Sequence, residues 1–133
     1  MANIVPDSFK TDLLEGTFDF GSSGSTFRLA LYTDISGFST STTAYTTTNE
    51  VSSSGTNYTA GGNTLTNNGV SIASNTAFVD FADLTFSSVT LTADSALIYK
   101  DTSNEAVLVL DFGGDKTATN GDFVIQFPTA DSS

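Results

Sequence analysis

The sequence predicts an all-β domain, either an antiparallel β-sandwich or a jelly-roll-like fold, with one short N-terminal helix. Its apolar residues occur in short runs, many of which alternate with polar residues. Alternation with a period of two is typical of strands that bury one face. Stretches of Ser, Thr, Gly and Asn separate these runs, and such residues favour turns. A length of 133 residues fits one domain, residues 1–133, with one hydrophobic core.

Residues 6–16 carry the helical signal. Phe9, Leu13 and Leu14 follow one another at spacings that place them on one face of a helix, and Gly16 suits its end. A helix this short is marginal without packing. We expect it to cover the core, or alternatively to act as an arm that binds a partner protein.

The remaining elements are predicted as strands. They comprise residues 27–32, 64–74, 76–81, 84–86, 89–93, 96–100, 105–112 and 122–127. Residues 101–104 have turn composition between two apolar runs and predict a hairpin, while the glycines in 113–114 and 120–121 predict two further reversals. Residues 96–99 and 106–110 are apolar at nearly every position, which predicts strands covered on both faces.

Two segments lack a strand pattern. Residues 34–62 form a long stretch rich in Ser, Thr, Gly and Asn, which is typical either of disorder or of a functional loop ordered by a partner. Ile35, Phe38, Tyr45 and Val51 supply apolar anchors in it, so we expect contacts between subunits. Residues 129–133 are predicted to form a flexible polar tail.

The composition argues against most catalytic chemistry. The chain has no His and no Cys, the residues on which most acid–base and transition-metal chemistry depends. Four basic residues against 15 acidic ones give a formal net charge of −11, which would repel nucleic acid and anionic membranes. We therefore expect a protein that is not an enzyme and that binds neither nucleic acid nor membrane.

Carboxylates are the remaining candidates for a chemical site. The candidate sets are Asp111, Asp115 and Asp122 for calcium, and the pairs Asp80 with Asp83 and Asp94 with Asp101 for a two-carboxylate hydrolase. No dense calcium-binding loop is present, and nothing in the sequence fixes the separation of either pair. We favour carboxylates that solvate turns, and assign no catalytic, metal-binding or cofactor-binding residue.

Several blocks of sequence resemble a group of small virion proteins of tailed bacteriophages. They are SFKTDLLEGTFD at 8–19, FRLALYT at 27–33, YTAGGNTLT at 58–66, DLTFS at 83–87 and ALIYKDT at 96–102. The blocks span most of the chain, and residues 34–54 are the least similar part. The resemblance implies a structural component of the virus particle.

Within that group we favour a capsid decoration, or cement, protein. Such a protein binds the major capsid protein on the outer surface of the virion, after synthesis in the host cytoplasm, and stabilises the head through many weak contacts. Self-association as a trimer is a further expectation. The residues predicted to contact partners are Phe9, Leu13, Leu14, Ile35, Phe38 and Tyr45. The alternatives are a tail-tube or tail-tip protein and a carbohydrate-binding β-domain.

Overall fold

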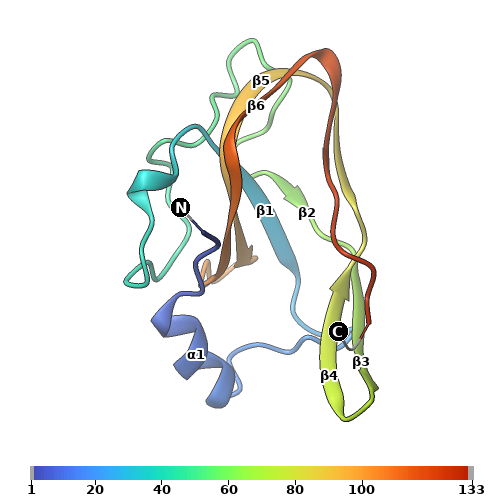
Figure 1. Cartoon of the computed structure of the whole chain (residues 1–133). Helices are drawn as coiled ribbons and strands as arrows, with labels where there is room; N and C mark the ends of the chain where they lie inside the picture. The colour runs from blue at the N-terminus through green and yellow to red at the C-terminus, as the bar shows by residue number, and fades with distance from the viewer. Residues whose placement is uncertain (1, 132–133) are drawn as a thin grey trace.

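The computed structural model describes residues 2–131, and within this range the chain forms one α-helix and two antiparallel sheets (Figure 1). The elements are α1 (Asp7–Leu14), β1 (Phe27–Tyr32), a 3₁₀ turn η1 (Ile35–Gly37), β2 (Asn63–Thr64), β3 (Asn67–Ala73), β4 (Thr76–Phe81), β5 (Leu84–Lys100) and β6 (Ala106–Ile125). The larger sheet has the order β2-β1-β5-β6, and β3 and β4 form the second. The predicted all-β fold with one short helix is confirmed.

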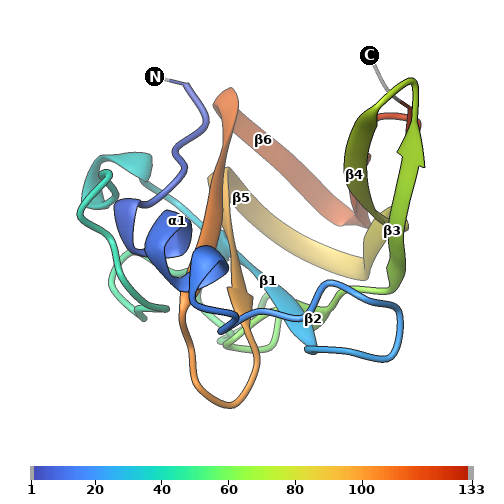
Figure 2. The same cartoon turned by 90° about the horizontal axis from the view of Figure 1, so that it is seen from below.

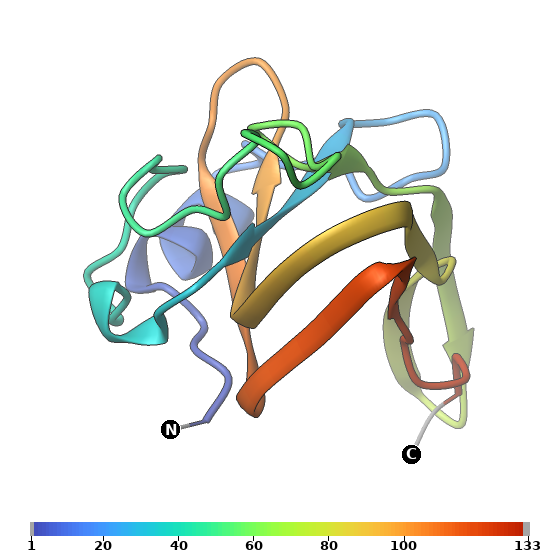
Figure 3. The ribbon, with the colours of Figure 1, turned by 90° about the horizontal axis from the view of Figure 1, so that it is seen from above.

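A long ribbon made of β5 and β6 dominates the larger sheet (Figure 3). Their connection confirms the predicted hairpin, since Tyr99 pairs with Ala106 across residues 101–104. Thr102 and Asn104 both have positive φ there, as tight turns often require. The ribbon rises beside β1 and curves over at the top of Figure 1, so that its two arms face each other.

The reversal predicted at 113–114 is wrong, because β6 continues through it. Ser95 pairs with Asp111 and Ala93 with Lys116, so β6 uses more residues than β5 over the same span. The extra residues form a bulge, in which the positive φ of both glycines bends the strand without ending it.

The reversal predicted at 120–121 is a second bulge. Val89 pairs with Gly121 and Leu91 with Ala118, and Asn120 takes a φ of 46° between these positions. Several predicted strands are thus parts of β5 and β6, joined through bulges that give the ribbon its curvature.

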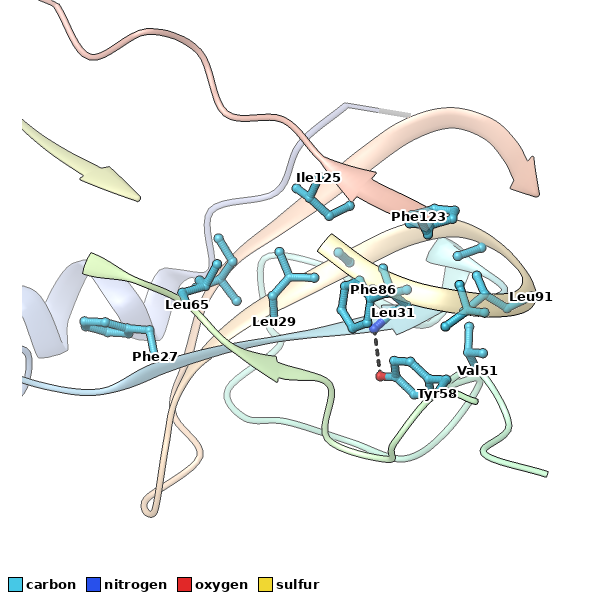
Figure 4. Packing of buried hydrophobic residues seen from close by; sticks show 14 of the residues in the cluster. Phe27, Leu29, Leu31, Val51, Tyr58, Leu65, Phe86, Leu91, Phe123 and Ile125 are labelled. Carbon is cyan, nitrogen blue, oxygen red and sulfur yellow. Dashed lines mark hydrogen bonds between the residues drawn. The ribbon is translucent and has the colours of Figure 1, made fainter. Parts of the chain in front are cut away.

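The core occupies both faces of the larger sheet. Alternate residues of β1 divide between two buried clusters, with Leu29 and Leu31 in the first and Ala30 and Tyr32 in the second. The first cluster lies inside the bend of the ribbon. There Phe86 and Leu91, from the first half of β5, and Phe123 and Ile125, from the end of β6, belong to the same cluster as Leu29 and Leu31 of β1 (Figure 4). The two runs predicted to be covered on both faces are confirmed. Residues 96–99 alternate between the same two clusters, and in the run 106–110 Ala106 and Val109 belong to the second cluster and Val107 to the first.

The helix α1 confirms the predicted helix in a shorter form. It ends before Gly16, which has a φ of 79°. The ring of Phe9 lies 5.1 Å from the ring of Phe18 and packs against the first cluster. Of the three residues of the predicted apolar face, only Phe9 packs against the core, and Leu13 and Leu14 are exposed.

Candidate protein-binding surfaces

The candidate carboxylate sites do not assemble. Among residues 2–131, no three acidic side chains lie close enough together to hold a metal ion, and this includes Asp111, Asp115 and Asp122. Asp94 lies within β5 and Asp101 follows its end, which at about 3.3 Å per residue separates them by roughly 20 Å. Paired carboxylates in glycoside hydrolases lie about 5 to 9.5 Å apart, so this pair does not fit that chemistry.

The pair Asp80 and Asp83 has hydrogen-bonding roles within the fold. Asp80 Oδ2 accepts from Asn68 Nδ2 at 2.7 Å, which ties the two strands of the small sheet together. Asp83 Oδ1 accepts from the backbone N–H of Phe127 at 2.9 Å and holds the segment after β6. Both carboxylates therefore position chain segments.

The 34–62 segment is ordered by the chain's own strands. The Val51 N–H donates to the carbonyl of Leu31 in β1 at 2.9 Å, and the Tyr45 N–H donates to the carbonyl of Asn104 at 2.9 Å. Phe38 of the segment belongs to the second buried cluster, whereas Val51 and Tyr58 belong to the first, so the segment contributes to the core on both faces of the sheet. Its order comes from within the molecule.

The three predicted contact residues of this segment point into the second cluster. Phe38 is 4% exposed, and its ring packs edge-on against Tyr32 at 4.8 Å. Tyr45 stacks on Tyr99 with 4.7 Å between ring centroids, and Ile35 packs against the same cluster. The structure gives these side chains intramolecular contacts and leaves Phe38 with almost no surface to offer a partner.

Glu50 organises the segment. Its carboxylate accepts from the hydroxyl of Tyr45 at 2.7 Å, the hydroxyl of Tyr58 at 2.8 Å and the backbone N–H of Gly61 at 2.6 Å. Tyr58 in turn accepts from the Leu31 N–H at 3.0 Å, as the dashed line in Figure 4 shows. Our sequence reasoning missed this residue. The signal was that Glu50 is the single charged residue between Asp34 and Asp80.

The tyrosines around Glu50 are held in their neutral form. Burial is the main reason that the pKa of Tyr58 lies far above its usual value, and the Glu50 carboxylate raises it further. Burial likewise raises the pKa of Tyr32 and of Tyr45, again with a contribution from Glu50. A neutral hydroxyl can donate a hydrogen bond to the carboxylate, so this arrangement stabilises the folded conformation of the segment.

The exposed end of α1 forms a first candidate surface, which we call the α1 patch (Leu13, Leu14 and the acidic residues beside them). Leu14 is 89% exposed and Leu13 is half-exposed. Asp12 and Glu15 flank the leucines in the chain. Lys10, the basic residue of the helix, is engaged in an ion pair with Asp7 at 2.8 Å. An apolar pair with an acidic rim therefore faces solvent.

The β3–β4 hairpin forms a second candidate surface, which sequence reasoning also missed. In Figure 2 it stands at the opposite side of the molecule from α1. Val70 lies opposite Val79 and Ile72 opposite Ala77, so these four side chains share one face. Ile72 is 73% exposed and Val70 is 58% exposed. The alternation of Val70 with Ile72 and of Ala77 with Val79 is visible in the sequence, but it does not say which face is covered.

An apolar groove of about 590 Å³ lies between the hairpin and the helix side of the molecule. Val79 and Phe81 line it from β4, and Val5 and Phe9 line it from the N-terminal side. Residues 127–131 form part of its wall, which places the described part of the predicted tail along the groove. Residues 132–133 of that tail lie outside the described residues.

Comparison with known proteins gives no family assignment. No protein-family model, curated protein or solved structure matches the chain. Within the described residues, no helix has both the length and the apolar character needed to cross a bilayer.

Proposed function

We propose that this chain is a decoration protein of a tailed-bacteriophage head, which binds the outer surface of the major capsid lattice and stabilises it. The observation that carries the proposal is the α1 patch. A leucine that is 89% exposed on a helix with acidic neighbours matches a protein surface that has an apolar pocket and a basic rim. The sequence resemblance to phage virion proteins supplies the class of partner.

The size of the patch suits a lattice. Two leucines and their rim form a small contact, well below the roughly 800 Å² per partner of a stable complex between two proteins. A capsid offers many copies of the same site. Any protein that binds the assembled lattice better than its separated subunits stabilises the assembly by mass action. Weak contacts repeated over the shell are therefore sufficient for a cement role.

The location can be tested on purified particles of the virus that encodes the chain. Quantitative mass spectrometry should give a copy number comparable to that of the major capsid protein, and cryo-electron microscopy should place the chain on the outer shell. A copy number of only a few per particle, with density on the tail, would instead establish the tail-protein alternative and end this proposal.

The surface can be tested with matched variants on particles that lack the protein. The double variant Leu13→Ser, Leu14→Ser should lose binding to the capsid, and particles incubated with it should open at the temperature of undecorated particles. Val124→Ser is the control, because it removes a half-exposed apolar side chain from β6. Equal binding by both variants would show that the α1 patch is not the capsid contact.

A further inference from the structure

Two Asn-Gly pairs in the chain can undergo covalent chemistry without an enzyme, Asn68-Gly69 and Asn120-Gly121. The side-chain amide of asparagine can react with the backbone nitrogen of the next residue, and a glycine there hinders the approach least because it has no Cβ. Both asparagines are exposed, and both lie at β-bulges, one in β3 and one in β6. The fold therefore places the same reactive pair in two similar backbone settings.

The surroundings of Asn68 oppose the reaction. Its Nδ2 donates a hydrogen bond to the Asp80 carboxylate at 2.7 Å. Such a charge-assisted bond fixes the side chain and leaves more electron density on the amide, so Cγ becomes a poorer target for a nucleophile. The backbone N–H of Gly69, which would supply that nucleophile, is buried and donates to Asn67 Oδ1 at 2.8 Å.

The surroundings of Asn120 have the opposite polarity. The Thr90 hydroxyl donates a hydrogen bond to Asn120 Oδ1 at 3.3 Å, and it accepts one from the backbone N–H of Asn120 at 3.0 Å. When a nucleophile adds to Cγ, negative charge develops on Oδ1. A donor already aimed at this oxygen stabilises that charge, so Thr90 makes Cγ of Asn120 the better target.

The fold does not require glycine at position 121. A Cβ at Gly121 would have the carbonyl oxygen of Thr119 as its nearest contact among the described residues outside its chain neighbours, at an ordinary 3.6 Å, and its φ lies outside the left-handed region. Gly69, in contrast, has a φ of +92°. Backbone conformation therefore explains the glycine at position 69 but not the one at position 121, and Gly121→Ala is a variant that the fold can accept.

We infer that Asn120 is a site of spontaneous deamidation, with the Thr90 hydroxyl as the activating group and water as the reactant. The Gly121 nitrogen attacks Cγ of Asn120 and forms a C–N bond, while the bond from Cγ to Nδ2 breaks. Ammonia leaves with the proton of the Gly121 N–H, and a cyclic imide remains. Water then opens the ring at either carbonyl and gives isoaspartate or aspartate. Nothing is oxidised or reduced, and β6 gains a negative charge at its bulge.

Peptide mapping by mass spectrometry tests the inference on the purified chain, incubated at neutral pH either folded or in urea. The rate at Asn120 divided by the rate at Asn68 should be at least about tenfold larger in the folded chain than in urea. A ratio that folding leaves unchanged or lowers would overturn the inference. Gly121→Ala should slow the reaction at Asn120 and leave Asn68 as it was. Equal conversion of Asn120 in this variant would exclude the cyclic route.

Two substitutions at Thr90 separate activation from simple restraint of the bulge. Thr90→Val keeps the branched shape but removes the hydroxyl, and should slow the reaction at Asn120 by about three- to tenfold. Thr90→Ser keeps the hydroxyl and should react at nearly the wild-type rate. If Thr90 only restrained the bulge, its loss would loosen the backbone and speed the reaction. Faster deamidation in Thr90→Val, or equal slowing in both variants, would therefore refute activation by the hydroxyl.

Discussion

The 34–62 segment is irregular in backbone but well packed, whereas the β3–β4 hairpin is regular in backbone but has an exposed apolar face. The segment has little regular structure, yet Phe38 and Tyr45 are packed inside the molecule and Glu50 collects hydrogen bonds from three directions. The hairpin has regular strands and a tight turn, yet it exposes Ile72. Irregular backbone needs internal partners to stay ordered, whereas a strand pair satisfies its own backbone and can leave a face free. The free face is thus found on the regular element.

The largest effect is expected from Gly62→Ala, which breaks the anchor at the end of the 34–62 segment. A Cβ at Gly62 would lie 1.8 Å from the carbonyl oxygen of Leu29, and its φ is +72°. We expect a loss of more than about 3 kcal/mol in the free energy of unfolding, measured with urea. Gly55→Ala is the control, because Gly55 has the same φ of +72° with no atom within 4 Å. It should cost about 1 kcal/mol. Equal losses would mean that the close approach to β1 does not matter.

Glu50→Gln should destabilise the segment next. An amide nitrogen cannot accept a hydrogen bond, so Tyr45, Tyr58 or the Gly61 N–H would lose its acceptor. We expect a loss of about 1 to 3 kcal/mol in unfolding free energy and faster hydrogen exchange confined to the segment. Glu15→Gln makes the same charge change at an exposed position and should stay within about 0.5 kcal/mol of the wild type.

Alkaline pH should lower the free energy of unfolding through the tyrosines of the same region. Burial raises the pKa of Tyr32, Tyr45 and Tyr58 in the folded chain above the unfolded value of about 10. The stability that these neutral tyrosines contribute is therefore complete below about pH 10 and is lost as the pH rises further, because the unfolded chain releases their protons first. Urea unfolding at a series of pH values should show this fall.

The slope of the unfolding free energy against pH identifies which tyrosines cause the loss of stability. Tyr58→Phe should make it shallower by up to about 1.4 kcal/mol per pH unit, because one titrating group is removed. An unchanged slope in this variant would mean that Tyr58 does not contribute to the alkaline loss.

The smallest effect is expected in the hairpin. Ile72→Thr should change the unfolding free energy of the dilute monomer by no more than about 0.5 kcal/mol, because the side chain is already exposed. Urea unfolding of the variant and of the wild type at the same protein concentration measures the difference. A large loss in the dilute chain would show that the hairpin face packs within the monomer after all.

Much of the fold followed from local pattern. The helix, β1, β4 and the turn at 101–104 lie where periodicity and turn residues indicate them. The predicted reversals at 113–114 and 120–121 were wrong because glycine and asparagine with positive φ serve equally in turns and in bulges. The choice depends on whether a partner strand continues past them, and β5 does.

The candidate surfaces were less accessible to sequence reasoning. Apolar side chains such as Ile35, Phe38 and Tyr45 are expected in a loop that contacts another subunit and equally in one that packs on the chain's own sheet. Leu14 and Ile72 look like core residues until their neighbours in space are known. Contacts between residues far apart in the chain decide these cases.

The sequence by itself determined an acidic all-β chain with one helix, because the period of its apolar residues and its charges are local properties. The tertiary structure decided which apolar residues are covered. Curvature of the β5–β6 ribbon depends on pairings such as that of Leu84 with Ile125, and the packing of residues 34–62 depends on their hydrogen bonds to Leu31 and Asn104. No local pattern encodes these contacts.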